Sequence, residues 1–238
     1  MIEKMGVQPV PHSDSAGTGL AEWEAMDPDS LVSGTPVQRG WLADEDPATG
    51  YLAGVWDCTA FVDEPGNYGV DEFMLLLEGT VVMRLPVGSD VTVEAGEAFV
   101  VPKGLACQWS QPGYVRKVFM IVDDPVADGP TNPSLSRITK PPLGARPLAD
   151  AVACSETYFE SATGKMTVSV MTHAGGVTGQ STSKAHELFH VLEGSVTMVD
   201  GRKETRFGAG ETGYIRAGTT LTRRYAAGTR TLEAIYAP

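Results

Sequence analysis

An internal repeat constrains this chain more than any other feature. Residues 71–81 align without gaps on residues 186–196, and each segment contains a Glu followed seven residues later by a Gly. The same register sets residues 56–59 against residues 171–174. Two copies of one pattern, separated by the length of a small domain, predict that the chain contains two copies of one fold.

The local patterns in both copies are those of β-strands. Short runs of β-branched and aromatic residues are broken by glycine turns, as in residues 79–85, 98–102 and 114–122. Only residues 20–26 and 148–154 have a helical pattern. Many short strands at this spacing predict an all-β chain of barrels or sandwiches.

Length and proline content indicate where the two copies separate. The chain has 238 residues, which fits two domains of about 110 to 120 residues each. Six of its 16 prolines lie between residues 123 and 147, a density typical of a linker. We therefore expect an N-terminal domain over residues 1–130 and a C-terminal domain over residues 131–238.

Charge, hydropathy and cysteine content limit the partners. The net charge of -12 opposes binding to nucleic acid. The longest apolar runs have five residues, so no membrane or secretion segment is expected. The three cysteines are widely spaced and contain no CxxC pair, which fits a cytoplasmic protein without disulfides. The expected partner is a small molecule, and a homodimer is possible.

Three short motifs resemble those of the cupin superfamily. They are the Glu seven residues before a Gly, a later Gly-Glu pair, and a Pro-x-Gly turn at residues 102–104. The first copy in particular is similar to cupins grouped near (S)-ureidoglycine aminohydrolase. The resemblance implies two tandem cupin jelly-roll barrels (double-stranded β-helices). It also implies an enzyme alternative, the metal-assisted hydrolysis or isomerisation of a small nitrogenous metabolite.

The positions that hold the metal in cupins are changed in both copies. The family pattern has two His before the Glu and a third His three residues after the Gly of the Pro-x-Gly turn. Those positions hold Gly66, Tyr68 and Cys107 in the first copy, and Ser181, Ser183 and Leu221 in the second. We therefore expect no cupin metal centre and no cofactor in either domain.

The first copy has the residues of a small-molecule pocket. By the family pattern Glu72 points into the barrel, and Trp56, Cys107 and Trp109 line the same interior. A carboxylate beside an aromatic wall suits an amine or ureido compound. Two alternatives stay open: a neighbouring donor satisfies Glu72, and Cys107 is either a reactive thiolate or a small packing residue.

The second copy replaces this aromatic wall with a cation. Arg223 stands where the first copy has Trp109, so beside Glu187 it forms either an ion pair or an anion site. Since this cation neutralises Glu187 internally, the pattern predicts that the second barrel is largely structural. Ligand binding is then expected in the first barrel, at a free Glu72.

Residues 186–190 spell HExxH, the zinc-peptidase signature, in which a helix places both His on one face. The repeat instead predicts a strand here, and four strand residues span about 13 Å, too far for one zinc. A zinc peptidase is therefore a remote alternative. A different metal site involving His173, His186 or His190 stays open.

Overall fold

The computed structural model describes residues 6–12, 19–124, 129, 133–138 and 154–238. These residues form two compact units, named barrel 1 and barrel 2 below. Barrel 1 lies within His12–Pro141, and barrel 2 combines Met1–Pro11 with Pro142–Pro238. The expected first domain, residues 1–130, thus differs from barrel 1 at both ends. It begins before His12 and ends before Pro141.

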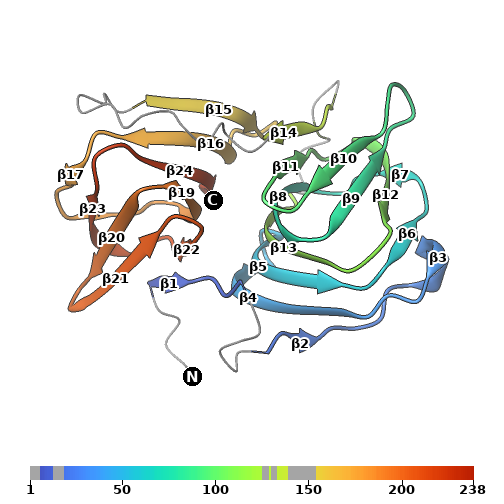
Figure 1. Ribbon diagram of the computed structural model, residues 1–238, viewed down its shortest axis with the longest axis horizontal. Coiled ribbons are helices and arrows are strands. Elements are labelled where there is room, and N and C mark those ends of the chain that lie inside the picture. The colour runs from blue at the N-terminus through green and yellow to red at the C-terminus, as the bar shows by residue number, and fades with distance from the viewer. Residues whose placement is uncertain (1–5, 13–18, 125–128, 130–132, 139–153) are drawn as a thin grey trace. The chain divides into compact units, whose positions relative to one another are not determined.

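Barrel 1 consists of two antiparallel sheets (Figure 1). In order across the larger sheet, the strands are β14 (Ser136–Ile138), β11 (Ala98–Val101), β8 (Asp71–Glu78), β13 (Val115–Val122), β5 (Tyr51–Cys58), β4 (Gln38–Asp46) and β2 (Ala21–Glu22). The smaller sheet has the order β10 (Val91–Glu94), β9 (Thr80–Arg84), β12 (Ala106–Gln111), β6 (Phe61–Asp63) and β3 (Leu31–Gly34), with β7 (Gly66–Asn67) also paired to β12.

Barrel 2 repeats this arrangement. Its larger sheet has the order β1 (Val7–Pro9), β22 (Thr212–Ile215), β19 (His186–Glu193), β24 (Thr229–Tyr236), β16 (Met166–His173) and β15 (Cys154–Glu160). The other sheet has β17 (Gly176–Val177), β23 (Thr220–Tyr225), β20 (Ser195–Asp200) and β21 (Lys203–Gly208), with β18 (Ser181–Thr182) paired to β23. The predicted all-β pair of cupin barrels is confirmed.

The helical pattern of residues 20–26 was misleading. Ala21 and Glu22 form strand β2, and Ala21 pairs with Gly40 at the edge of β4. A single 3-10 turn, η2 (Pro28–Ser30), follows. Pairing with an open sheet edge outweighs the weak helical preference of so short a segment. Residues 148–153 lie outside the described part of the chain.

The glycine shared by both copies closes a tight turn. Gly79 has φ 84° and its counterpart Gly194 has φ 77°, backbone angles that residues other than glycine rarely adopt. A Cβ on Gly79 would also lie 2.1 Å from the carbonyl oxygen of Tyr114. The glycine of the repeat is therefore required for backbone geometry.

Segments distant in sequence complete both larger sheets. Strand β1 pairs with β22, and Val7 opposite Ile215 is buried in the core of barrel 2. Strand β14 pairs with β11, and Arg137 on it forms an ion pair with Glu97 at 2.7 Å. The N-terminal strand thus belongs to barrel 2, although the chain continues from it into barrel 1.

Candidate functional site

The interior of barrel 1 contains an ion pair between neighbouring strands. Glu72 on β8 is 3% exposed, and its Oε1 accepts a hydrogen bond from Nζ of Lys117 on β13 at 2.9 Å. The hydroxyl of Tyr68 donates to the other carboxylate oxygen. Glu72 therefore lies in the barrel interior beside a cation and a hydroxyl donor.

Aromatic rings enclose the ammonium group of this pair. Nζ of Lys117 lies 4.7 Å from the ring centroid of Trp56 and 4.9 Å from that of Trp109. It also contacts the sulfur of Met74 at 3.2 Å. Indole faces attract cations, so both rings contribute a cation–π contact to the ammonium group.

This pair overturns the expectation of a free Glu72. The carboxylate is neutralised within the barrel, as Glu187 was expected to be in barrel 2. Lys117 was overlooked because it lies in an apolar run, residues 115–122. The available signal was that Lys117 lies two residues before Phe119 and four before Ile121, since alternate strand residues share a face.

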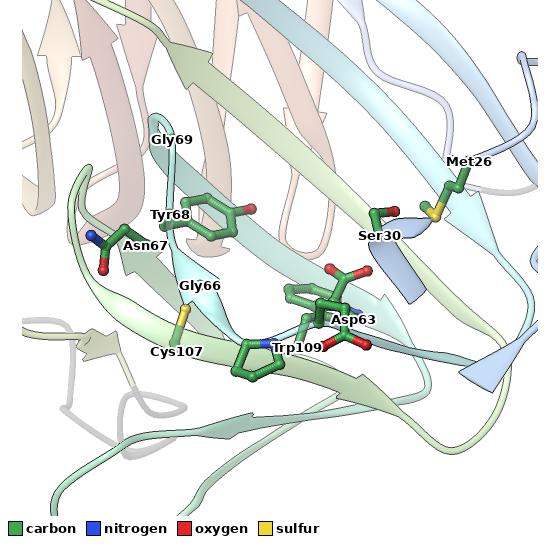
Figure 2. Close-up of a pocket in the computed structure, with 11 residues that line it drawn as sticks. Met26, Ser30, Asp63, Gly66, Asn67, Tyr68, Gly69, Cys107 and Trp109 are labelled. Atoms are coloured by element: carbon green, nitrogen blue, oxygen red, sulfur yellow. The ribbon is translucent and has the colours of Figure 1, made fainter. Parts of the chain in front are cut away.

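A cavity of about 500 Å³ lies beside Trp109 (Figure 2). Strand β12 supplies Cys107 and Trp109, and the segment around β7 supplies Tyr68. The other lining residues are Met26, Ser30, Asp63, Glu64, Pro65, Gly66, Asn67 and Gly69. A second cavity, of about 150 Å³, is lined by Trp56, Glu72 and Lys117 together with Trp23, Leu52, Phe119 and Ile121.

Glu64 and Asp63 both line the larger cavity, and Asp63 is the more buried of these two carboxylates. Burial raises the pKa of Asp63 from 3.8 to about 6, and the nearby charge of Lys117 opposes the shift. No ion pair to Asp63 forms among the described residues of barrel 1. Asp63 was also missed from the sequence, although it lies two residues after the core residue Phe61 and so shares its face.

Cys107 is buried beside this cavity. Burial raises the pKa of its thiol to about 11, with a further contribution from the charge of Asp63. A thiol with this pKa is protonated at neutral pH, and the thiolate is the nucleophilic form. The structure therefore favours Cys107 as a packing residue of the pocket wall.

The residues at the cupin metal positions of barrel 1 do not form a metal-binding set. Gly66 has no side-chain donor, and a Cβ there would meet nothing within 4 Å. The hydroxyl of Tyr68 has a pKa well above its usual value because of burial and the charge of Glu72. Glu72 already forms an ion pair with Lys117. Among the residues the structure describes, no group of three or more His, Cys, Asp or Glu could hold a metal ion.

Barrel 2 neutralises its carboxylate in a parallel way. Nη2 of Arg223 lies 2.7 Å from both carboxylate oxygens of Glu187, and Oγ of Ser183 donates to Oε1 at 2.5 Å. Ser183 stands four residues before Glu187, as Tyr68 stands four residues before Glu72. In each barrel a hydroxyl and a basic side chain bind the Glu of the cupin motif. The basic residue lies on β13 in barrel 1 and on β23 in barrel 2.

The zinc-peptidase alternative is wrong. Residues 186–193 form strand β19, not a helix. Nδ1 of His186 lies 2.6 Å from the hydroxyl of Tyr214, and Nδ1 of His190 lies 2.9 Å from Oγ1 of Thr212. Both His alternate with Glu187 along the strand and therefore lie on the opposite face.

Two jelly-roll barrels, each with an inward Glu on the strand before the shared glycine turn, define a tandem cupin. The chain belongs to the EutQ-like cupin domain family, which matches residues 46–119 and 160–231. The family therefore covers both barrels. No curated protein matches the chain.

Solved structures share the fold across most of the chain. A protein of unknown function of the DUF861 family from Pseudomonas syringae pv. tomato is 18% identical with TM-score 0.72, covering 96% of this chain and 98% of that one. The putative glyoxylate induced protein of Pseudomonas aeruginosa is 15% identical with TM-score 0.56, covering 83% and 79%. Ylba of Escherichia coli is 12% identical with TM-score 0.54, covering 90% of each chain.

Within the described residues, no helix is long and apolar enough to cross a membrane.

Proposed function

We propose that barrel 1 binds a small nitrogenous cation, such as an amine or a guanidine, in the cavity beside Trp109. The observation that carries the proposal is Asp63, a desolvated carboxylate that faces this cavity without an ion pair among the described residues. A cation bound there would stabilise the ionised form of Asp63 and recover the desolvation cost.

The internal ion pair supports this ligand class. Lys117 and Glu72 balance each other's charge, which leaves Asp63 as the partly buried carboxylate of this cavity without an ion pair among the described residues, whereas Glu64 is exposed to solvent. Trp109 contributes an aromatic wall to the same cavity, and indole rings favour cations. The resemblance of the first copy to cupins near (S)-ureidoglycine aminohydrolase agrees with a nitrogenous ligand.

Barrel 1 is proposed to bind this cation and not to carry out the metal-assisted reaction of those cupins. Gly66 and Tyr68 at the metal positions do not suit a metal, and Lys117 neutralises the neighbouring carboxylate of Glu72. Trp56, Cys107 and Tyr68 then act by shaping the pocket around the ion pair.

Methylguanidinium and methylurea form a matched pair of probes, because they share a shape and differ in charge. We expect isothermal titration calorimetry to detect methylguanidinium and to find methylurea much weaker. Asp63→Asn should weaken methylguanidinium about 10- to 150-fold, as expected for losing a charge-assisted hydrogen bond of about 1.5 to 3 kcal/mol.

The control is Asp90→Asn, which removes one exposed carboxylate from barrel 1 away from the cavity. It should leave affinity unchanged. Equal binding of methylurea, or an unchanged affinity in Asp63→Asn, would refute a site that recognises positive charge at Asp63.

A further inference from the structure

The interior of barrel 2 is polar at positions where barrel 1 is apolar. Glu233 lies opposite Phe189 on β19, as Phe119 lies opposite Met74 on β8. The repeat also places Thr167, Ser169 and His173 where barrel 1 has Leu52, Gly54 and Cys58. Burying polar and charged side chains costs free energy, so core packing alone does not explain these residues.

These side chains share the inner face of one sheet. Phe189 and Val191 belong to the core of barrel 2, and residues directly opposite them on β24 point to the same side. These are Glu233 and Thr231. Pairing between β24 and β16 continues this face to Ser169 and Met171, and hence by alternation to His173.

Three of these side chains contact one another. Nε2 of His173 lies 2.9 Å from Oγ1 of Thr231, whose hydroxyl donates to Oε1 of Glu233 at 2.6 Å. His173 lies 3.6 Å from Glu233 and stacks on Tyr225 with a centroid separation of 3.7 Å. The side chains of His173 and Glu233 remain 14% and 15% exposed although they face inward, so solvent reaches the interior.

The two carboxylates in this interior, Glu187 and Glu233, differ in their basic partners. Arg223 is bound to Glu187 through both carboxylate oxygens. Glu233 has no Lys or Arg partner among the described ion pairs of barrel 2, and its nearest basic group is the imidazole of His173. Glu233 therefore resembles Asp63 in barrel 1, although the repeat aligns Glu233 with Phe119: each is a carboxylate without a described Lys or Arg ion pair, in a barrel whose motif Glu is already neutralised.

Tyr225 connects the two parts of this interior. Its hydroxyl has a pKa raised by burial and then by the charge of Glu233, while Arg223 opposes the shift. Tyr225 thus lies in the fields of both Glu233 and Arg223. The ring of Tyr225 stacks on His173, which in turn lies 3.6 Å from Glu233, so a cation that binds Glu233 lies beside this stacked pair.

We propose that barrel 2 contains a second binding site, for a small organic cation held by Glu233 beside the stacked rings of His173 and Tyr225. The site is separate from the cavity of barrel 1 and does not depend on the function proposed there. It also revises the expectation that barrel 2 is largely structural.

Stoichiometry in the full-length chain tests this site with methylguanidinium as the probe. We expect two equivalents to bind the unmodified chain, one to bind Glu233→Gln, one to bind Asp63→Asn, and none to bind the double variant. Gln can still accept the Thr231 hydrogen bond, so the fold of Glu233→Gln should survive, and its melting curve checks this. Glu204→Gln removes an exposed carboxylate of barrel 2 and should still bind two.

The outcomes separate this site from the one in barrel 1. One equivalent in the unmodified chain, lost in Asp63→Asn and kept in Glu233→Gln, would overturn the barrel 2 site and leave the barrel 1 site standing. One equivalent lost only in Glu233→Gln would support barrel 2 and overturn barrel 1. No binding to the unmodified chain would overturn both. As a second readout, the imidazole NMR signals of His173 should shift on titrating Asp63→Asn with the probe.

Discussion

The ammonium nitrogen of Lys117 lies 2.9 Å from a carboxylate oxygen of Glu72, and their side chains are only 9% and 4% exposed. Glu72 is the Glu of the cupin motif, seven residues before Gly79. In this chain the side chain of Lys117 balances the charge of Glu72 within the barrel.

Removing the cation should destabilise barrel 1 strongly. Lys117→Met keeps the length of the side chain and leaves Glu72 buried without its ion-pair partner, which typically costs about 3 to 5 kcal/mol. Adding Glu72→Gln to this variant should recover part of the loss. Urea denaturation of the four proteins of this cycle measures the coupling, and a loss below about 1 kcal/mol in Lys117→Met would contradict a tightly coupled pair.

The equivalent change in barrel 2 should cost less. The side chains of Arg223 and Glu187 are 17% and 18% exposed, so solvent partly stabilises a Glu187 that has lost its partner. We expect Arg223→Met to reduce the free energy of unfolding by less than Lys117→Met does. The same denaturation experiments compare them, and the reverse order would show that burial does not control the cost.

Asp63 should make stability depend on pH. Its pKa rises from 3.8 to about 6 on folding, so its favourable contribution is complete below about pH 4 and is lost as pH increases through 6. Asp63→Asn cannot ionise, so it should match the natural chain at pH 4 and exceed its stability at pH 8. The difference between these two pKa values limits the gain in the free energy of unfolding to about 3 kcal/mol. Equal stability at both pH values would indicate that the carboxylate is not desolvated.

Deleting residues 1–11 should loosen barrel 2 and leave the strands of barrel 1 intact. The deletion removes β1, exposing the edge of β22 and removing Val7 from the core. Hydrogen exchange should therefore show faster amide exchange in β22, whereas β8 and β13 keep their protection. Unchanged protection in β22 would mean that β1 contributes little to the sheet.

Thiol reactivity should separate the three cysteines. Burial raises the pKa of Cys58 and of Cys107 to about 11, whereas Cys154 is exposed. Iodoacetamide at pH 7.5 should modify Cys154 first, because a thiol with a pKa near 11 is less than about 0.1% thiolate at that pH. Peptide mass spectrometry identifies the modified residue, and early labelling of Cys107 would restore the reactive-thiolate interpretation.

The sequence by itself determined the fold and the inward carboxylates. Repetition of residues 71–81 at 186–196 carries the two-barrel architecture, because each copy encodes the same alternation and the same glycine turn. Alternation also separates Glu187 from His186 and His190, which excluded the zinc-peptidase geometry. These features depend on neighbouring residues in one strand, and local periodicity records them.

Only the tertiary structure decided the partner of Glu72, whereas the repeat had already placed Arg223 beside Glu187. Lys117 is 45 residues from Glu72, and Arg223 is 36 residues from Glu187. The repeat did not predict the first pair, since barrel 1 places its cation on β13 and barrel 2 on β23. The exchange of β1 into barrel 2 is likewise a matter of strand pairing across the chain. Such contacts depend on which strands become neighbours in the folded barrel. The pattern of residues along one strand does not say which residue of another strand will lie against it.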